Sequence, residues 1–410
     1  MSAAAAGSSP ADGVSLFGPA MRDDPYSLYD RLRAADPVHW SEADQGWLVT
    51  SYDAVVAGLN DLRLSSDRAA VLQRWANDES LAPFFSFLSR RMILTDPPRH
   101  TRLRGLVSRA FTPAAVESMR PHVQSIIDRL LDGVAASARM DFIRDFAYPL
   151  PATVIMEMLG LPEGDRDQLK LWADQFVVFF STHPAKVSHE EYRRALDAMQ
   201  AMTAYFRSVM PAIRSRDDSC LMNVMAGAAA DGDRLTEDEL YANANLLLIA
   251  GHETTTHLLA NGLHALLTHP DQCDLVRSDP SRIPGAVEEL LRLVGPVQFT
   301  HRVALEDVPL GGRSIRRGDF VFLFLAAANR DPIHFPEPNR LDVTRPAHKH
   351  VAMGLGHHFC LGAPLARLEV QLALESVFRR LPKLRLADGP LEYQGNVNLH
   401  GFKALPVRWD

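Results

Sequence analysis

Cysteine and excess charge are both scarce in this 410-residue sequence, and each scarcity excludes a class of protein. The three cysteines, Cys220, Cys273 and Cys360, form no closely spaced pair, so they provide no disulfide framework and suit a reducing compartment. Lys and Arg together number 43 and Asp and Glu 50, which gives a formal net charge of −7. This balance lacks the strong positive charge that is typical of nucleic-acid-binding proteins.

The sequence also lacks a long apolar run and a secretory leader. Apolar runs such as Leu246–Ala250 are far shorter than the stretch of about 20 residues that crosses a bilayer. The small, polar segment Met1–Gly13 has no basic residue, and the first one is Arg22. We therefore expect a cytoplasmic protein that spans no membrane, with a flexible N-terminal tail over residues 1–14.

Helical periodicity dominates the rest of the chain, and no linker or change of composition divides it, so we expect one mostly helical domain over residues 15–410 with a small sheet. Helices are predicted over Asp24–Ala35, His100–Arg109, Ala114–Ala135, Pro151–Leu159, Gln168–Phe180, Glu190–Ser215, Ala286–Val294 and Ala363–Arg380. Strands are predicted over Val38–Trp40 and Trp47–Thr50, a hairpin over Arg313–Leu325, and further strands over Leu391–Val407. The segment Asp67–Thr95 is predicted to be a long mixed loop with a functional reason for its length.

The clearest element is a long helix that begins at Thr236. Thr236 and Glu239 form a capping-box pattern, and no proline follows until after Thr268, so the helix should be about 50 Å long. Gly251 in its interior should cost about 1 kcal/mol relative to alanine, which predicts close approach by a ligand or a local opening of the helix. The neighbouring Glu253 and Thr254 supply the acid and the hydroxyl of a proton relay, although a solvent-facing pair would look the same.

The segment Met353-Gly-Leu-Gly-His-His-Phe-Cys-Leu-Gly362 is the most informative part of the sequence. Its three glycines and the following Pro364 predict a tight loop that leads into a helix N-terminus. There Cys360 would face backbone N–H groups and the positive helix end, which stabilise a thiolate that can bind iron. A small buried cysteine is one alternative. A zinc site with His348, His350, His357 and His358 is less favoured, since such sites normally show two clusters of paired ligands.

This segment resembles the haem-binding loop of cytochromes P-450, with the pattern Phe-x-x-Gly-x-His/Arg-x-Cys-x-Gly. Gly356, His358, Cys360 and Gly362 match it, and Met353 stands where the family has phenylalanine, beside the sulfur. The resemblance implies the P-450 fold, a mainly α triangular prism with a small β region and a long central helix over the haem. It also implies haem b as cofactor, with Cys360 as the iron ligand.

The resemblance extends in family order from about residue 20 to the C-terminus and assigns further roles. It implies that Glu253 and Thr254 deliver protons during dioxygen activation. The residues that it places at the haem are Gly251, Met353, Gly354 and Cys360, with His100, Arg104, Arg302 and His358 on the propionates. It implies a buried triad of Glu289, Arg292 and Arg340 that supports folding and the haem loop.

The implied activity is a monooxygenase that inserts one oxygen atom from O2 into a largely apolar small molecule by hydroxylation or epoxidation. No flavin or iron–sulfur segment is left over, so electrons from NAD(P)H should come through a separate ferredoxin and ferredoxin reductase. A fatty acid, terpenoid or polyketide-type substrate is expected, and the protein should be monomeric. A peroxide-driven haem enzyme and a non-catalytic haem-binding or ligand-binding protein remain alternatives.

The resemblance also suggests which residues contact the substrate and the redox partner. The expected pocket walls are Phe84, Phe85, Phe87, the segment Phe176–Phe180 with Phe179, Asn243, Leu246, Leu247, Val297, Phe299 and Val397. The candidate docking residues on the cysteine side are Arg102, Arg109 and Arg367, for which ordinary surface arginines are an equally good explanation.

Overall fold

A computed structural model describes residues 15–410 apart from positions 17, 19, 20, 23, 77, 178–186, 217–219, 228, 231, 232, 347 and 348. The predicted tail over residues 1–14 lies outside the described residues, as do Phe179 and His348.

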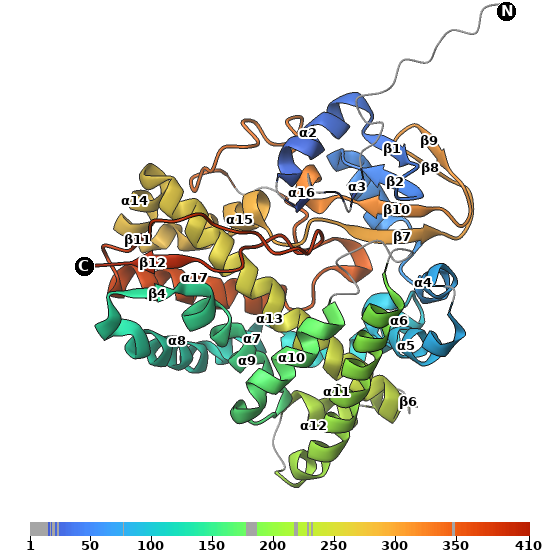
Figure 1. The fold of residues 1–410 in the computed structure, drawn as a ribbon, viewed down its shortest axis with the longest axis horizontal. Coiled ribbons are helices and arrows are strands. Elements are labelled where there is room, and N and C mark those ends of the chain that lie inside the picture. Colours follow the sequence, from blue (N-terminus) through green and yellow to red (C-terminus); the bar gives the residue numbers. More distant parts are fainter. Residues whose placement is uncertain are drawn as a thin grey trace, which may run out of the picture.

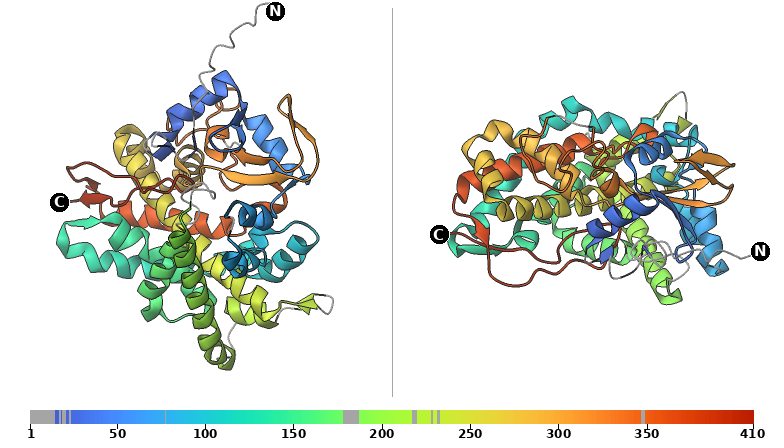
Figure 2. Two further views of the ribbon diagram at one scale, coloured as in Figure 1. Left: turned by 45° about the vertical axis from the view of Figure 1, so that its right-hand side comes forward. Right: turned by 90° about the horizontal axis from the view of Figure 1, so that it is seen from above.

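Helices make up most of the described chain and surround the long helix α13 (Glu237–Thr268), which crosses the molecule (Figure 1). The other α-helices are α2 (Pro25–Ala35), α3 (Tyr52–Asn60), α4 (Ala69–Ala76), α5 (Ala82–Leu88), α6 (Arg99–Ser108), α7 (Pro113–Ser118), α8 (Arg120–Val134), α9 (Pro149–Leu159), α10 (Arg166–Val177), α11 (His189–Ser215), α12 (Leu221–Gly227), α14 (Pro270–Ser278), α15 (Ile283–Val294), α16 (Leu325–Ala328) and α17 (Ala363–Arg380). Seen from above, the helices form a flattened body with the small sheet at one end (Figure 2).

The long helix begins where the capping box predicts. The Thr236 Oγ1 accepts a hydrogen bond from the Glu239 N–H at 3.2 Å, and the Glu239 carboxylate accepts one from the Thr236 N–H at 3.1 Å. Every side chain from Glu239 to Ile249 is buried, which is the pattern of a helix enclosed on all sides. Helices α9, α15 and α17 pack against α13 and place it at the centre of the main hydrophobic core.

The main sheet lies beside α2, α3 and α16 and has the strand order β1-β2-β10-β7-β3 (Figure 1). Its strands are β1 (Val38–Ser41), β2 (Gly46–Val49), β3 (Leu64–Ser65), β7 (Thr300–Ala304) and β10 (Phe320–Leu323). Smaller sheets are formed by β4 (Arg139–Asp141) with β12 (Pro406–Arg408) and β11 (Arg385–Leu386), by β5 (Ala229–Ala230) with β6 (Asp233–Arg234), and by β8 (Val308–Leu310) with β9 (Arg313–Ile315).

The predicted hairpin over Arg313–Leu325 is wrong. Strand β9 pairs with β8, whereas β10 pairs with β2 in parallel and with β7 antiparallel. All four residues of β10 are buried, as in a strand at the centre of a sheet, and two of the three residues of β9 are exposed. The two segments therefore belong in different sheets.

Three other expectations need correction. The segment Asp67–Thr95 contains α4, α5 and two short 3-10 turns, because its aromatic side chains pack into the core. The helix expected over Ala114–Ala135 is two helices, α7 and α8, separated at Met119. Within Leu391–Val407, pairing is limited in the described chain to the bridges Tyr393↔Phe402 and Val297↔Leu399 and to β12.

No helix in the described part of the chain combines the length and the apolar character that crossing a membrane requires.

Candidate active site

A cavity of about 300 Å³ lies between α13, the Cys360 loop and α17. Its lining brings together nine predicted site residues: His100, Arg104, Gly251, Thr254, Arg302, Met353, Gly354, His358 and Cys360. These residues come from four separate parts of the chain, so their meeting around one space is a result of the fold. Glu253 is absent from the described lining.

The Cys360 loop is a tight turn that depends on glycine. Gly354 and Gly356 have φ angles of 70° and 66°, in the left-handed region that favours glycine. A Cβ on Gly356 would also lie 3.0 Å from the Asn60 Oδ1. The Cys360 N–H donates to the Met353 carbonyl at 2.8 Å and closes the loop just before α17 begins.

The Cys360 sulfur lies among positive groups, and the residue is half-buried. Burial raises the pKa of the thiol, while the backbone N–H groups of Gly362 and Ala363 and the charges of Arg104 and Arg367 act in the opposite direction. A metal ion at the sulfur would add a much larger positive charge and hold it as a thiolate. The loop is therefore built to present a sulfur ligand.

Another part of the cavity lining carries cationic and donor groups, some of whose polar atoms lack a partner in the described structure. Burial lowers the pKa of Arg68 to about 9 and that of Arg302 to about 10, so both stay charged at neutral pH. Five lining side chains have buried polar atoms without a hydrogen-bond partner in the described structure: Ser66 Oγ, Arg68 Nε, His100 Nδ1, His358 Nε2 and Glu369 Oε2. The first four belong to side chains that can donate a hydrogen bond. Buried donors and cations normally have partners, so these atoms fit a ligand that carries carboxylates.

The lining of the cavity therefore fits a haem, with Cys360 as a sulfur ligand and a separate set of residues as propionate partners. Arg68 and Ser66 join the predicted set of His100, Arg104, Arg302 and His358. Sequence reasoning missed both: Arg68 lies near the start of the segment Asp67–Thr95, which was predicted to be a loop, and Ser66 directly precedes that segment. In the zinc alternative, His350 is unsuited as a ligand, since its Nε2 lies 3.0 Å from the Glu288 carboxylate and its Nδ1 accepts from the Ala352 N–H at 3.2 Å.

A family model for cytochrome P450 matches residues 66–384 of the chain. The chain belongs to the cytochrome P450 family. The family brings a haem-thiolate cofactor and monooxygenase chemistry, so the chain is an oxidoreductase of that type.

Known P450s resemble the chain along nearly its whole length. The P450 monooxygenase PikC of Streptomyces venezuelae is 43% identical, over 98% of this chain and 95% of its own. The structure of P450BioI with an acyl carrier protein ligated to hexadec-9Z-enoic acid has a TM-score of 0.89 and 37% identity, over 96% of this chain and 100% of that chain. The structure of the myxobacterial P450 CYP267B1 with myristic acid has a TM-score of 0.89 and 39% identity, over 96% of this chain and 98% of that chain. The predicted fold class is confirmed.

In this P450, Glu253 and Thr254 face different surroundings. The Thr254 hydroxyl lines the cavity and donates to the Ala250 carbonyl at 3.0 Å. Glu253 lies near Asp174 and Lys170 of α10, and burial and then Asp174 raise its pKa to about 7, against Lys170. Successive helix positions are about 100° apart, which explains the divergence. The acid and the alcohol thus lie on two sides of α13.

Of the two reasons predicted for Gly251, the local opening of the helix is wrong, and close approach by a ligand stays a prediction, because Gly251 lines the cavity. The helix is continuous through it, so there is no local opening. A Cβ at this position would lie 2.8 Å from Ile155 of α9, so the missing side chain allows α9 and α13 to pack closely beside the cavity. In the described structure, helix α9 makes a close approach to Gly251.

The predicted substrate contacts are only partly correct. Leu246, Leu247 and Val297 line the cavity. Phe84, Phe85, Phe87, Asn243, Phe299 and Val397 are buried but do not line it.

The misassigned residues have structural partners instead. Phe84 packs against Phe176 at 5.8 Å between ring centroids, and Phe299 packs against Phe324 at 5.3 Å. The Asn243 amide donates to the Arg90 carbonyl at 3.0 Å and accepts from the Met92 N–H at 2.9 Å. Sequence reasoning missed several lining residues: Met92, Ile93, Phe111, Ile155, Leu258, Leu291 and Thr300.

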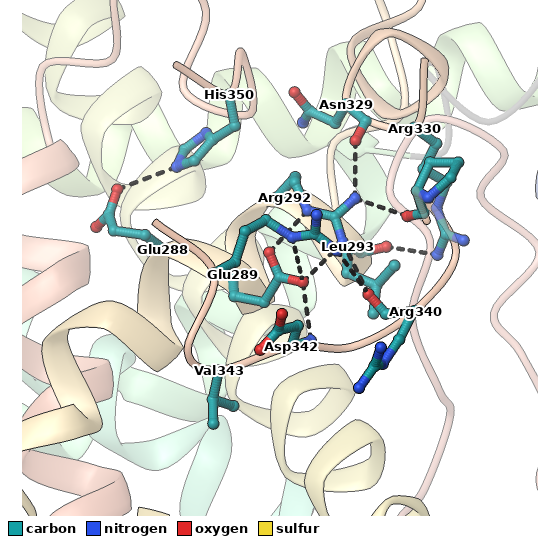
Figure 3. A network of polar contacts seen from close by, with 12 residues as sticks. Glu288, Glu289, Arg292, Leu293, Asn329, Arg330, Arg340, Asp342, Val343 and His350 are labelled. Atoms are coloured by element: carbon teal, nitrogen blue, oxygen red, sulfur yellow. Dashed lines mark hydrogen bonds and ion pairs between the residues drawn. The ribbon is translucent and has the colours of Figure 1, made fainter. Parts of the chain in front are cut away.

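The predicted ion triad is wrong in its third member. Glu289 and Arg292 form a buried ion pair with both oxygens at 2.7 Å (Figure 3). The Arg345 Nε, and not Arg340, makes the second contact with Glu289, at 3.3 Å. Arg340 offers its backbone carbonyl to Arg292 at 3.1 Å, and its half-exposed side chain pairs with Glu337 at 2.9 Å.

Two of the candidate docking arginines are engaged within the chain. Arg102 forms an ion pair with Glu239, and Arg367 forms one with Glu288 at 2.6 Å. The Arg109 side chain lies outside the described residues.

Proposed function

We propose that this P450 binds haem b and uses O2 to hydroxylate or epoxidise a largely apolar small molecule, with electrons from NAD(P)H through a separate ferredoxin and its reductase. The observation that carries the proposal is a cavity whose lining contains both Cys360 and two buried arginines, Arg68 and Arg302, that make no ion pair with a carboxylate in the described structure.

Two groups of lining residues would hold the iron and the propionates of the cofactor. Cys360 would supply the iron ligand, and His100, Arg104, Arg302 and His358, with Arg68 and Ser66, would hold the propionates. When bound, the haem supplies the oxidising chemistry, which a thiolate ligand favours.

Two residues of α13 would handle protons. The Thr254 hydroxyl, anchored on the Ala250 carbonyl, keeps its oxygen lone pairs available to the cavity. Glu253, with a pKa of about 7, can both hold and release a proton at neutral pH. Because the two side chains face different surroundings, a water molecule or a rotation of Glu253 has to connect them.

The rest of the lining favours an apolar substrate. Leu246, Leu247, Ala250, Val297 and Met92 provide hydrocarbon surface that excludes water and binds by the hydrophobic effect. The fatty-acyl and myristic acid ligands of P450BioI and CYP267B1 support a fatty acid, and a terpenoid or polyketide-type compound has the same apolar character.

The test begins with the reduced, carbon monoxide-treated protein, which should give a thiolate-type haem spectrum. Cys360→His should lose that spectrum, while Cys273→Ala, a change of a different cysteine, should keep it. Turnover is then measured under ¹⁸O₂ with NADPH, ferredoxin and ferredoxin reductase, and the product should contain one labelled oxygen atom.

Two outcomes would overturn the proposal. Full turnover with hydrogen peroxide and no electron donor, and little with O2, would indicate a peroxide-driven enzyme. Substrate binding without any substrate-dependent NADPH consumption, with several ferredoxins, would indicate a binding protein.

A further inference from the structure

Arg91 is a buried arginine with very few partners. It follows α5, and its side chain is only 2% exposed. One guanidinium nitrogen, Nη2, donates to the Asn245 Oδ1 at 3.0 Å, and the Nε is buried without a partner in the described structure. The guanidinium carbon lies 4.8 Å from the centre of the Phe176 ring. A guanidinium has five N–H donors, so most of its capacity is unused.

The other buried arginines of the described chain show how unusual this is. Arg292 binds the Glu289 carboxylate and three backbone carbonyls. Arg330 donates to the Leu293 carbonyl and to Asn339, with Asp30 contributing a negative charge.

The remaining two buried arginines, Arg68 and Arg302, make no ion pair with a carboxylate in the described structure, and both line the cavity where the cofactor carboxylates would bind. A buried arginine in this chain thus has either a protein partner or a place beside a ligand. Arg91 has neither a carboxylate nor a backbone carbonyl as a partner among the described residues, and its one hydrogen bond goes to the Asn245 side-chain amide.

The electrostatic surroundings of Arg91 support the same conclusion. Burial alone lowers its pKa to about 9, so the side chain is still charged at neutral pH, and no neighbouring acid contributes. A buried charge without a counter-ion is unfavourable unless an anion joins it. The missing partner is therefore an anion.

Arg91 does not itself line the active-site cavity, but residues next to it and next to its partner Asn245 in the sequence do. The two residues that follow it, Met92 and Ile93, line the cavity, and so do Leu246 and Leu247, which follow its partner Asn245. Ile93 is 47% exposed, so this part of the lining extends to the surface of the molecule.

We propose that Arg91 binds the carboxylate of a substrate whose remaining part is an apolar chain, with the carboxylate taking the place of the Asn245 Oδ1. The inference rests on the proposed function, because it names the substrate class of the same cavity. A carboxylate can accept two parallel N–H bonds from a guanidinium, which an amide oxygen cannot. An ester or an alcohol of equal chain length would keep the apolar contacts and lose the charge.

The experiment compares dodecanoate with methyl dodecanoate on the haem-loaded protein, by equilibrium dialysis at pH 7.5. The unmodified protein should bind the acid more tightly than the ester, by about tenfold or more. Arg91→Met should weaken acid binding by about tenfold and leave ester binding unchanged, and Arg91→Lys should fall between. Arg90→Met is the matched control, since the neighbouring Arg90 faces Asp238 at 3.4 Å, and it should change neither affinity.

Equal binding of acid and ester by the unmodified protein would overturn the inference without any variant. It would also be overturned if Arg91→Met bound the acid normally, or weakened both ligands equally, since that result would indicate a structural role. A thiolate-type carbon monoxide spectrum in the same sample separates the two proposals. If it is present, only the substrate class is wrong, and if it is missing, the proposed function itself fails.

Discussion

At the scale of single residues, Thr254 is the side chain whose chemistry the cavity exposes most directly. Its hydroxyl is anchored on the Ala250 carbonyl and lines the cavity. Thr254→Ala removes a group that can pass a proton, so we expect the product formed per NADPH to fall by roughly an order of magnitude. NADPH consumption, product and hydrogen peroxide are measured together. Thr254→Ser, which keeps the hydroxyl, should keep most of the coupling, and equal coupling in both variants would refute the role.

Glu253 gives a second prediction at this scale, because its raised pKa in the folded protein makes the stability depend on pH. The folded protein holds the Glu253 proton more tightly than the unfolded chain does. At low pH both states are protonated and Glu253 does not destabilise the fold, but as the pH rises from about 4.5 toward 7 its ionisation increasingly lowers the free energy of unfolding. Glu253→Gln removes that cost. Its advantage in free energy of unfolding should grow over this interval to roughly 1–3 kcal/mol and then level off, after discounting for partial exposure.

The measurement is urea unfolding at several pH values, followed by circular dichroism. Asp174, Lys170 and Tyr148 are the charged and titratable groups near Glu253, and they stay unchanged in the variant. Glu190→Gln, at an exposed position on α11, serves as the control and should show no such dependence. A constant difference between Glu253→Gln and the unmodified protein at all pH values would contradict the raised pKa.

At the scale of helices, Gly251 decides how closely α9 and α13 pack. An alanine is favoured over glycine in a helix by about 1 kcal/mol, but its Cβ would lie 2.8 Å from Ile155, and overpacking costs about 1–3 kcal/mol. We therefore expect Gly251→Ala to destabilise the protein. Adding Ile155→Ala should make the Gly251→Ala change favourable, as a double-mutant cycle of thermal unfolding would show. Additive effects would mean that the two helices do not compete for this space.

The ion network around α15 gives a second test at this scale, because it joins that helix to the segment before the Cys360 loop (Figure 3). Arg345 contacts the buried Glu289, whereas Arg340 pairs with the exposed Glu337. We expect Arg345→Met to lower the free energy of unfolding by about 1–3 kcal/mol and Arg340→Met to change it by less than about 0.5 kcal/mol. The opposite order in chemical denaturation would restore the triad predicted from the sequence.

These elements also show what a sequence can predict. The start of α13 and the whole of α17 are local, since a capping box and a proline at the first turn determine them within a few residues. The pairing of β10 with β2 and β7 is long-range, and so is the choice of Arg345 over Arg340, and neither leaves a local pattern. The Cys360 loop could be predicted because its chemistry is contained within ten consecutive residues. Ser66, Arg68 and Arg91 could not, because their roles depend on what the fold places opposite them.

At the scale of the whole molecule, the protein is built around charges that need a partner from outside the chain. Burial lowers the pKa of both Arg68 and Arg302, Arg302 lowers that of Arg68 further, and the acids that act on these arginines are Asp67 and Asp96. Without haem, these cations cost stability, and with haem the propionates compensate them. The haem-free protein should therefore unfold at a clearly lower temperature than the haem-loaded protein, beyond the loss of apolar contacts.

Arg302→Met separates the electrostatic contribution from the apolar one. Replacing a buried, unpaired cation by an apolar side chain of similar size should stabilise the haem-free protein and raise its unfolding temperature. It should also weaken haem binding and lower the unfolding temperature of the haem-loaded protein, so the gap between the two temperatures should become smaller. Arg313→Met, at an exposed position paired with Asp36, should leave the gap unchanged. Calorimetry of both forms, with haem affinity from transfer to an acceptor protein, measures the effect. If Arg302→Met destabilised the haem-free protein, the guanidinium would have to be a structural part of the fold, because it would then be stabilising without any cofactor to pair with.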